Sequence, residues 1–121
     1  MEVMDPLRRQ VTDDSLNALI KCFELLRVLD VEMPAQTVAV LLYIMSHDGC
    51  HSQAVQEDLD ITAASVSRNA TWLTGTHRSN PARGLNLITK ESDPINRRRN
   101  VFYLTREGKQ LAKQLSDILN G

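Results

Sequence analysis

The sequence predicts a mainly α-helical protein with a small β-hairpin, which is an α+β fold class. Apolar residues recur at helical spacing along most of the chain. Two short segments, residues 86–90 and 101–104, flank a turn that contains Asp93-Pro94 and are predicted to form the hairpin. Residues 62–106 carry eight basic and two acidic side chains, whereas residues 1–61 carry four basic and eleven acidic ones. Because the whole chain has a net charge of −1, this basic block indicates a polyanion held on one side of the molecule.

Length and composition limit the class of protein. A chain of 121 residues is expected to form one domain, residues 1–121, with residues 1–12 as a flexible N-terminus. Its 42% apolar and 24% charged residues are ordinary for a soluble globular protein, and two cysteines suit a reducing compartment. The N-terminus lacks the features of a signal peptide, and no apolar run approaches the roughly 20 residues of a membrane span. We therefore expect a cytoplasmic protein with no membrane association.

The first helix is predicted over residues 14–30, with Thr12, Asp13 and Asp14 available as caps. One apolar line along it comprises Leu16, Leu19, Ile20, Phe23 and Leu26, and a second comprises Cys22, Leu25 and Leu29. Together the two lines are wider than one core contact requires. Either both lines are buried within the monomer, or the second line docks on another subunit and residues 13–31 form a dimerisation helix.

Three further helices are predicted before the hairpin. The second helix begins at Pro34, a favourable first-turn residue, and ends between Ser46 and Gly49. Its apolar stripe is Val38, Leu41, Leu42 and Met45. Two short helices follow, residues 52–59 with Ser52 as the cap and residues 62–74 with Thr62 as the cap. Short helices separated by a break of three or four residues predict a helix-turn-helix over residues 52–74.

The helix at residues 62–74 has one apolar and one polar face. At about 100° per residue, its core stripe is Ala63, Val66, Ala70 and Leu73. The outward face is Ser65, Arg68 and Trp72, flanked by Ser67 and Asn69 and started by Thr62. Arg can pair with guanine and Asn with adenine, while Ser and Thr are adaptable, so this face is typical of a helix that reads the DNA major groove. The alternative is a solvated face with a stray Arg; for Trp72, packing against neighbouring residues is the favoured interpretation.

The hairpin, residues 86–104, has a basic tip. Arg97, Arg98 and Arg99 follow one another at the tip, residues 95–100, and alternate in direction on extended backbone. One of them can reach into a minor groove while another meets phosphate; a merely solvated charge run is the alternative. A hairpin placed after a helix-turn-helix predicts a winged helix-turn-helix. The preceding loop, residues 75–84, adds His77, Arg78 and Arg83, either as a second clamp on the DNA backbone or as a surface loop. Thr105 is expected to cap a last helix that carries Leu111, Leu115, Ile118 and Leu119 on its apolar side.

Four segments in register resemble the MarR family of winged helix-turn-helix transcription regulators. They are Ala64-Ser-Val-Ser-Arg68 followed by Leu73, Gly84-Leu-Asn-Leu-Ile88, Asp93-Pro-Ile-Asn-Arg-Arg98 and Leu104-Thr-Arg-Glu-Gly108. The resemblance spans residues 34–120 and implies that Thr62, Ser65, Ser67, Arg68 and Asn69 face the major groove. It also implies that Arg98 enters the minor groove with Arg97 beside it, and that N- and C-terminal helices, here residues 13–31 and 105–120, form a homodimer. Asn96 stands where the family has an Asp that braces the wing Arg, so an anion near phosphate is removed.

Other chemistry is disfavoured. His47, Cys50 and His51 lie within five residues, but a zinc site would need a fourth ligand, so polar turn residues are the preferred interpretation. Cys22 lies in an apolar run, which favours an inert thiol over a redox switch. The sequence contains no nucleophile elbow, phosphate-binding glycine loop or pair of catalytic carboxylates, so we expect neither an enzyme nor a cofactor.

The sequence thus predicts a homodimeric, sequence-specific regulator of transcription that binds double-stranded DNA. The expected DNA-binding residues are Thr62, Ser65, Ser67, Arg68, Asn69, Arg78, Arg83, Asn96, Arg97, Arg98 and Arg99. A small-molecule effector is compatible with the family, but the sequence does not indicate one. Two alternatives stay open: a winged-helix protein of replication or of plasmid or phage maintenance, and a protein-interaction adaptor that does not bind DNA.

Overall fold

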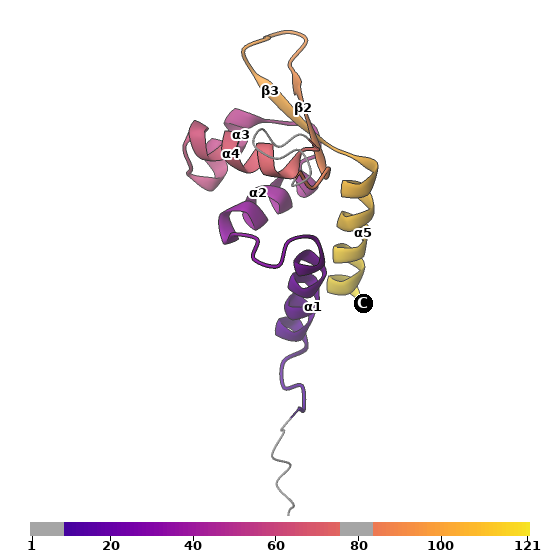
Figure 1. Cartoon of the computed structure of the whole chain (residues 1–121). Coiled ribbons are helices and arrows are strands. Elements are labelled where there is room, and N and C mark those ends of the chain that lie inside the picture. The colour runs from indigo at the N-terminus through magenta and orange to yellow at the C-terminus, as the bar shows by residue number, and fades with distance from the viewer. Residues whose placement is uncertain (1–8, 76–83) are drawn as a thin grey trace, which may run out of the picture.

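The computed structural model of the protein describes residues 9–75 and 84–121 (Figure 1). In chain order the elements are α1 (Asp14–Leu29), α2 (Ala35–Ser46), β1 (Cys50–His51), α3 (Ser52–Leu59), α4 (Ala63–Leu73), β2 (Ile88–Ser92), β3 (Asn100–Leu104) and α5 (Arg106–Asn120). The expected helices are all present with nearly the predicted bounds. Most of the predicted flexible N-terminus, and the loop residues His77, Arg78 and Arg83, lie outside the described residues. Within the described ranges, no helix combines the length and apolar character needed to cross a bilayer.

Side-chain caps fix the starts of three helices. Oδ1 of Asp13 accepts the Leu16 N–H at 3.1 Å at the start of α1. Thr62 accepts the Ser65 N–H at 3.1 Å before α4, and Thr105 accepts the Gly108 N–H at 3.0 Å before α5. These caps confirm the predictions for Thr62 and Thr105. The prediction for Ser52 was wrong, because His51 occupies the N-cap of α3 and makes no side-chain capping bond.

The strands form a three-stranded antiparallel sheet in the order β1-β3-β2. Strands β2 and β3 pair from Ile88↔Leu104 to Ser92↔Asn100 and form the predicted hairpin, which projects from one end of the molecule (Figure 1). Strand β2 starts two residues later than predicted, because Leu85, Asn86 and Leu87 instead donate backbone hydrogen bonds to the carbonyls of Trp72, Thr74 and Leu73. Strand β1 was not predicted; two residues are too few to show a periodicity.

The core is mostly aliphatic, with Phe102 as its largest fully buried side chain. On α4, Val66, Ala70 and Leu73 are buried as expected, but Ala63 is exposed in the first turn. On α2, Val38 and Leu41 are buried as predicted, but the buried side extends to two residues outside the predicted stripe. Val40 and Ile44 are fully buried there, whereas Leu42 is 45% exposed.

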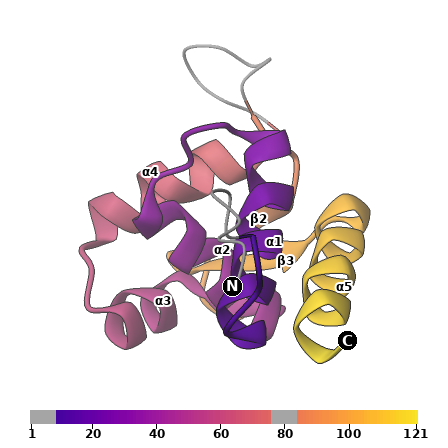
Figure 2. The ribbon, with the colours of Figure 1, turned by 90° about the horizontal axis from the view of Figure 1, so that it is seen from below.

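Helix α1 packs alongside α5 at the end of the molecule opposite the hairpin (Figures 1 and 2). Cys22 and Leu26 are buried, and Sγ of Cys22 lies 3.9 Å from the Leu115 carbonyl oxygen of α5. The most exposed members of the first apolar line are Leu16, Leu19, Ile20 and Phe23, at 59%, 44%, 59% and 47%. Cys22 of the second line therefore faces α5, whereas Leu29 of the same line is 41% exposed, and docking of the second line on another subunit stays a prediction. Helical spacing reveals two apolar lines, but it does not tell which of them faces the core.

Candidate nucleic-acid interface

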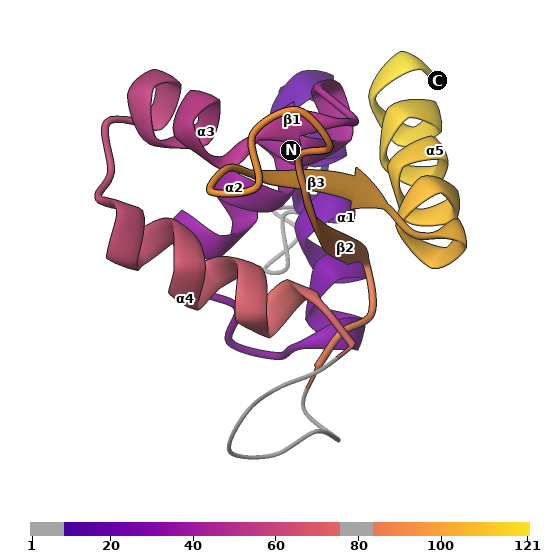
Figure 3. The same ribbon diagram turned by 90° about the horizontal axis from the view of Figure 1, so that it is seen from above.

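Helices α3 and α4 and the β2–β3 wing lie close together at one end of the molecule. Seen from above, α3 and α4 are on one side of the wing loop and α5 is on the opposite side (Figure 3). The turn between the two helices is tight, because Asp60 adopts a left-handed conformation with φ of 52° and the Ile61 N–H bonds back to the Gln56 carbonyl at 3.1 Å. This turn fixes the start of α4 next to α3 and gives the predicted helix-turn-helix.

A chain of hydrogen bonds runs along the first two turns of α4. The Thr62 hydroxyl donates to Oγ of Ser65 at 3.0 Å, and Nη2 of Arg68 donates to the same oxygen at 3.2 Å. Thr62, Ser67 and Arg68 are exposed and Ser65 is half-buried. The Arg68 guanidinium is therefore held over the start of α4, where one edge is engaged by a hydroxyl and its other donors face solvent.

Asn69 does not lie on the exposed face, contrary to the prediction. Its Oδ1 accepts from the Thr37 hydroxyl at 2.7 Å, and its Nδ2 donates to Oε1 of Gln36 and to the Ser65 carbonyl, both at 2.9 Å. The side chain is only 9% exposed. Asn69 follows Val66 by three residues, which places it about 60° from Val66 on the side of the core stripe. The helical wheel therefore predicts that Asn69 faces inward. Asn69 fastens α4 to α2 and is not available to a base.

Trp72 also packs inward, as predicted. Its indole Nε1–H donates to Oδ2 of Asp30 at 3.0 Å. Asp30 in turn ends α1, since its backbone N–H bonds to the Leu26 carbonyl at 3.0 Å. The C-terminal half of α4 is thereby tied to the end of α1.

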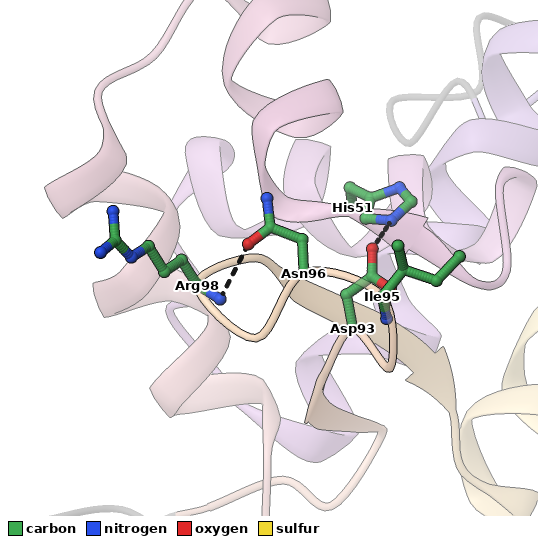
Figure 4. Close-up of polar contacts among 5 residues, drawn as sticks. All are labelled: His51, Asp93, Ile95, Asn96 and Arg98. Atoms are coloured by element: carbon green, nitrogen blue, oxygen red, sulfur yellow. Dashed lines mark hydrogen bonds and ion pairs between the residues drawn. The ribbon is translucent and has the colours of Figure 1, made fainter.

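The start of the wing loop is organised by Asp93, which follows β2 and is only 8% exposed (Figure 4). Its Oδ1 accepts the Ile95 N–H at 2.9 Å, and its Oδ2 lies 2.9 Å from Nε2 of His51 at the start of α3. The pKa of Asp93 is lowered, first by the hydrogen bond from the Ile95 N–H and next by the one from His51. This connection was missed, because His51 and Asp93 are distant in sequence and form no local pattern.

Asn96 shapes the tip of the wing. Its Oδ1 accepts the Arg98 N–H at 3.2 Å, and its carbonyl accepts the Arg99 N–H at 2.9 Å. Figure 4 shows the Arg98 side chain directed outward from the loop. The ion pairs between described residues are Arg27–Glu24, His51–Asp93 and Lys113–Asp117, so none of Arg97, Arg98 and Arg99 is paired within that part of the chain. All three are exposed and can meet an external anion.

Comparison with known proteins identifies the fold. No family model and no curated protein matches the sequence. Among solved structures, the S. aureus MepR–DNA complex is 19% identical, with a TM-score of 0.66 over 96% of this chain and 84% of that one. MarR is 20% identical, with a TM-score of 0.58 over 87% and 75%, and a MarR transcriptional regulator from Methanosarcina mazei Go1 is 15% identical, with 0.60 over 86% and 73%. The chain has the MarR winged-helix fold. At these identities the likeness establishes the fold alone, and it confirms the predicted α+β winged helix-turn-helix.

Within this MarR fold, the His and Cys residues after α2 have separate environments. His47 stacks on Tyr43 with ring centroids 4.2 Å apart, while His51 bonds to Asp93. The Tyr43 hydroxyl donates to Oδ2 of Asp58 at 2.6 Å, which raises the pKa of Tyr43 to about 12. Cys50 is half-buried, and burial raises the pKa of its thiol. No group of three or more His, Cys, Asp or Glu side chains in residues 9–75 and 84–121 is placed to hold a metal ion.

Replacing Asp93 by Asn should lower stability at neutral pH more than at acid pH. A carboxylate whose pKa is lowered by folding stabilises the folded state at pH values above its ordinary pKa of 3.8. This contribution is lost as the pH falls through the lower pKa of the folded state. In urea unfolding from pH 7 to pH 3, we expect the gap between the parent and Asp93→Asn to narrow as pH falls. Asp117→Asn, at an exposed helix pair, serves as the control. A gap that stays constant over this range would contradict the assignment.

Proposed function

We propose that the protein is a sequence-specific regulator of transcription that binds double-stranded DNA. Helix α4 enters the major groove with Thr62, Ser65, Ser67 and Arg68, and the wing tip reaches the minor groove with Arg98. The single observation that carries this proposal is that Arg97, Arg98 and Arg99 on the wing and Arg68 on α4 are all exposed and form no ion pair with any residue that the structure describes. The MepR structure of the same fold is a DNA complex, which supports the same use of the surface here. Asn69 is not part of the proposed surface, and the contribution of Arg78 and Arg83 stays a prediction.

The direct test is DNA binding as a function of salt. Affinity for a labelled duplex of mixed sequence should fall steeply between 50 and 200 mM salt, because each neutralised phosphate releases counterions; six to ten contacts would lower affinity by about 10³–10⁵. Selection of bound duplexes from a random pool should then enrich a defined sequence. Absence of binding at low salt would favour the adaptor alternative, and binding without enrichment would contradict sequence specificity.

We further propose that the protein is a homodimer joined through the exposed line Leu16, Leu19, Ile20 and Phe23 of α1. Leu119, near the C-terminal end of α5, is 54% exposed and extends the apolar character of this end of the molecule. Contiguous exposed apolar side chains of this kind are typical of protein–protein contacts. The surface lies at the end of the molecule opposite the wing (Figure 1), so pairing leaves the DNA surface open. A two-fold dimer would bind half-sites about one duplex turn apart.

The double substitution Ile20→Glu and Phe23→Glu should convert the dimer into a monomer. Two carboxylates in an apolar interface would lose their hydration without a partner, so the associated state is disfavoured. Analytical ultracentrifugation should give twice the chain mass of 13.6 kDa for the parent and the single mass for the variant. Leu42→Glu, at an exposed apolar position on α2, is the matched control and should remain a dimer. A parent that sediments as a monomer would refute the proposed interface.

A further inference from the structure

A polar groove separates α3 from the wing. Its volume is about 400 Å³, and Ser52, Gln53, Gln56 and Glu57 of α3 line one wall. Asn96, Arg98 and Arg99 of the wing line the other. The two walls come from segments more than 35 residues apart in the sequence, so no sequence pattern predicts the groove. Two guanidinium groups face a single carboxylate across it.

Hydrogen bonds connect the two walls of the groove and hold the wing loop. The 2.9 Å bond between Nε2 of His51 and Oδ2 of Asp93 joins the residue that precedes α3 to the start of the wing loop. The Asp93 N–H donates to the Arg99 carbonyl at 2.8 Å, and the Arg99 N–H donates to the Asn96 carbonyl at 2.9 Å. The backbone of Arg99 is thus held on both sides, and its side chain starts from a fixed point in the wall.

The available donors in the groove suit a phosphate. Oδ1 of Asn96 is occupied by the Arg98 N–H, which leaves its amide N–H groups for a ligand (Figure 4). An aspartate at this position would accept the same bond but would add a second negative charge to the groove. Guanidinium, side-chain amide and hydroxyl groups are the donors that proteins direct at the DNA backbone.

We propose that this groove seats one phosphate of the DNA backbone, held by Arg99 and the neighbouring amides, and that Glu57 limits its affinity. The proposal rests on the proposed DNA-binding function, because the first helix of a helix-turn-helix crosses the backbone while the second enters the major groove. Glu57 accepts from Nε2 of Gln53 at 3.0 Å, which holds the carboxylate at the α3 wall. Its charge opposes the phosphate at every DNA sequence, so it weakens binding without altering base preference.

The first test uses Arg99→Gln, Arg99→Lys and Glu57→Gln on a duplex selected by the unaltered protein. Arg99→Gln should lower affinity by a similar factor for all sequences and reduce the slope of log affinity against log salt by about 1. Arg99→Lys should retain most of the affinity and most of the salt slope, since the Lys ammonium can also pair with a phosphate. Glu57→Gln should raise affinity about two- to fivefold, as expected for one exposed charge. Glu32→Gln removes the same charge from the α1–α2 connection and should have little effect.

The second test locates the phosphate. Phosphates in the selected duplex are replaced one at a time by neutral methylphosphonates, and one replacement should weaken the parent but have no further effect on Arg99→Gln. Loss of affinity at that position in both proteins, or equal behaviour of Glu57→Gln and Glu32→Gln, would overturn the proposed groove while leaving DNA binding intact. Absence of salt-sensitive binding by the unaltered protein would overturn the proposed function as well.

Discussion

Replacing Gly108 by alanine is expected to destabilise the protein by about 3 kcal/mol, at the upper end of the usual cost of overpacking. Gly108 lies in the first turn of α5, where an added Cβ would overlap the carbonyl oxygen of Leu87. The helix cannot move away cheaply, because the same oxygen accepts the Thr105 N–H at 3.0 Å. The Thr105 hydroxyl also donates to the Asn86 carbonyl at 2.7 Å. Urea unfolding should show a large drop in the midpoint for Gly108→Ala.

Lys109→Ala is the matched control for this prediction. It introduces the same residue at an exposed position next to Gly108, and it should change stability by less than about 0.5 kcal/mol. Ala is a better helix former than Gly, so helix propensity alone would make Gly108→Ala stabilising. An unchanged or raised midpoint for Gly108→Ala would mean that α5 does not approach Leu87 as closely as described.

Most of the helices could be predicted from sequence because their signals are local. Thr62 and Thr105 cap the helices that follow them, and Val66, Ala70 and Leu73 recur at the spacing that buries one face. The incorrect predictions concern features that depend on tertiary contacts. Both apolar lines of α1 satisfy helical spacing, and only the position of α5 determines that Cys22 is buried while Phe23 is exposed.

In the candidate site, too, local signals were read correctly from the sequence and tertiary contacts were not. The exposure of Arg68 and of the wing arginines follows from a helical wheel and from the basic turn, so these residues were found from sequence. Asn69 was misassigned because its residue type suits adenine recognition, whereas its position favours bonds to Thr37 and Gln36. The bond between His51 and Asp93 requires β1 beside β3, and β1 is too short to be recognised in the sequence.

Arg68→Ala and Arg98→Ala should impair DNA binding in different ways. Arg68 starts from the exposed face of α4, where a guanidinium can pair with one base edge; its loss should remove about 1–3 kcal/mol of discrimination at a single base pair. Arg98 starts from the wing tip, and its loss should weaken binding to most sequences by a similar factor, with a salt slope that is smaller by about 1. The measurement is affinity for the selected duplex and for its single-base-pair variants at two salt concentrations.

Arg27→Ala provides the control for charge alone, since Arg27 lies on α1 and already pairs with Glu24 at 2.7 Å. It should leave both base preference and salt slope nearly unchanged. Equal effects of Arg68→Ala and Arg98→Ala on every sequence would contradict the proposed division, because both side chains would then act only on phosphates. The bond from Nη2 to Ser65 orients the Arg68 guanidinium and leaves its other donors for a base. Ser65→Ala should therefore affect the same base pair as Arg68→Ala, but more weakly.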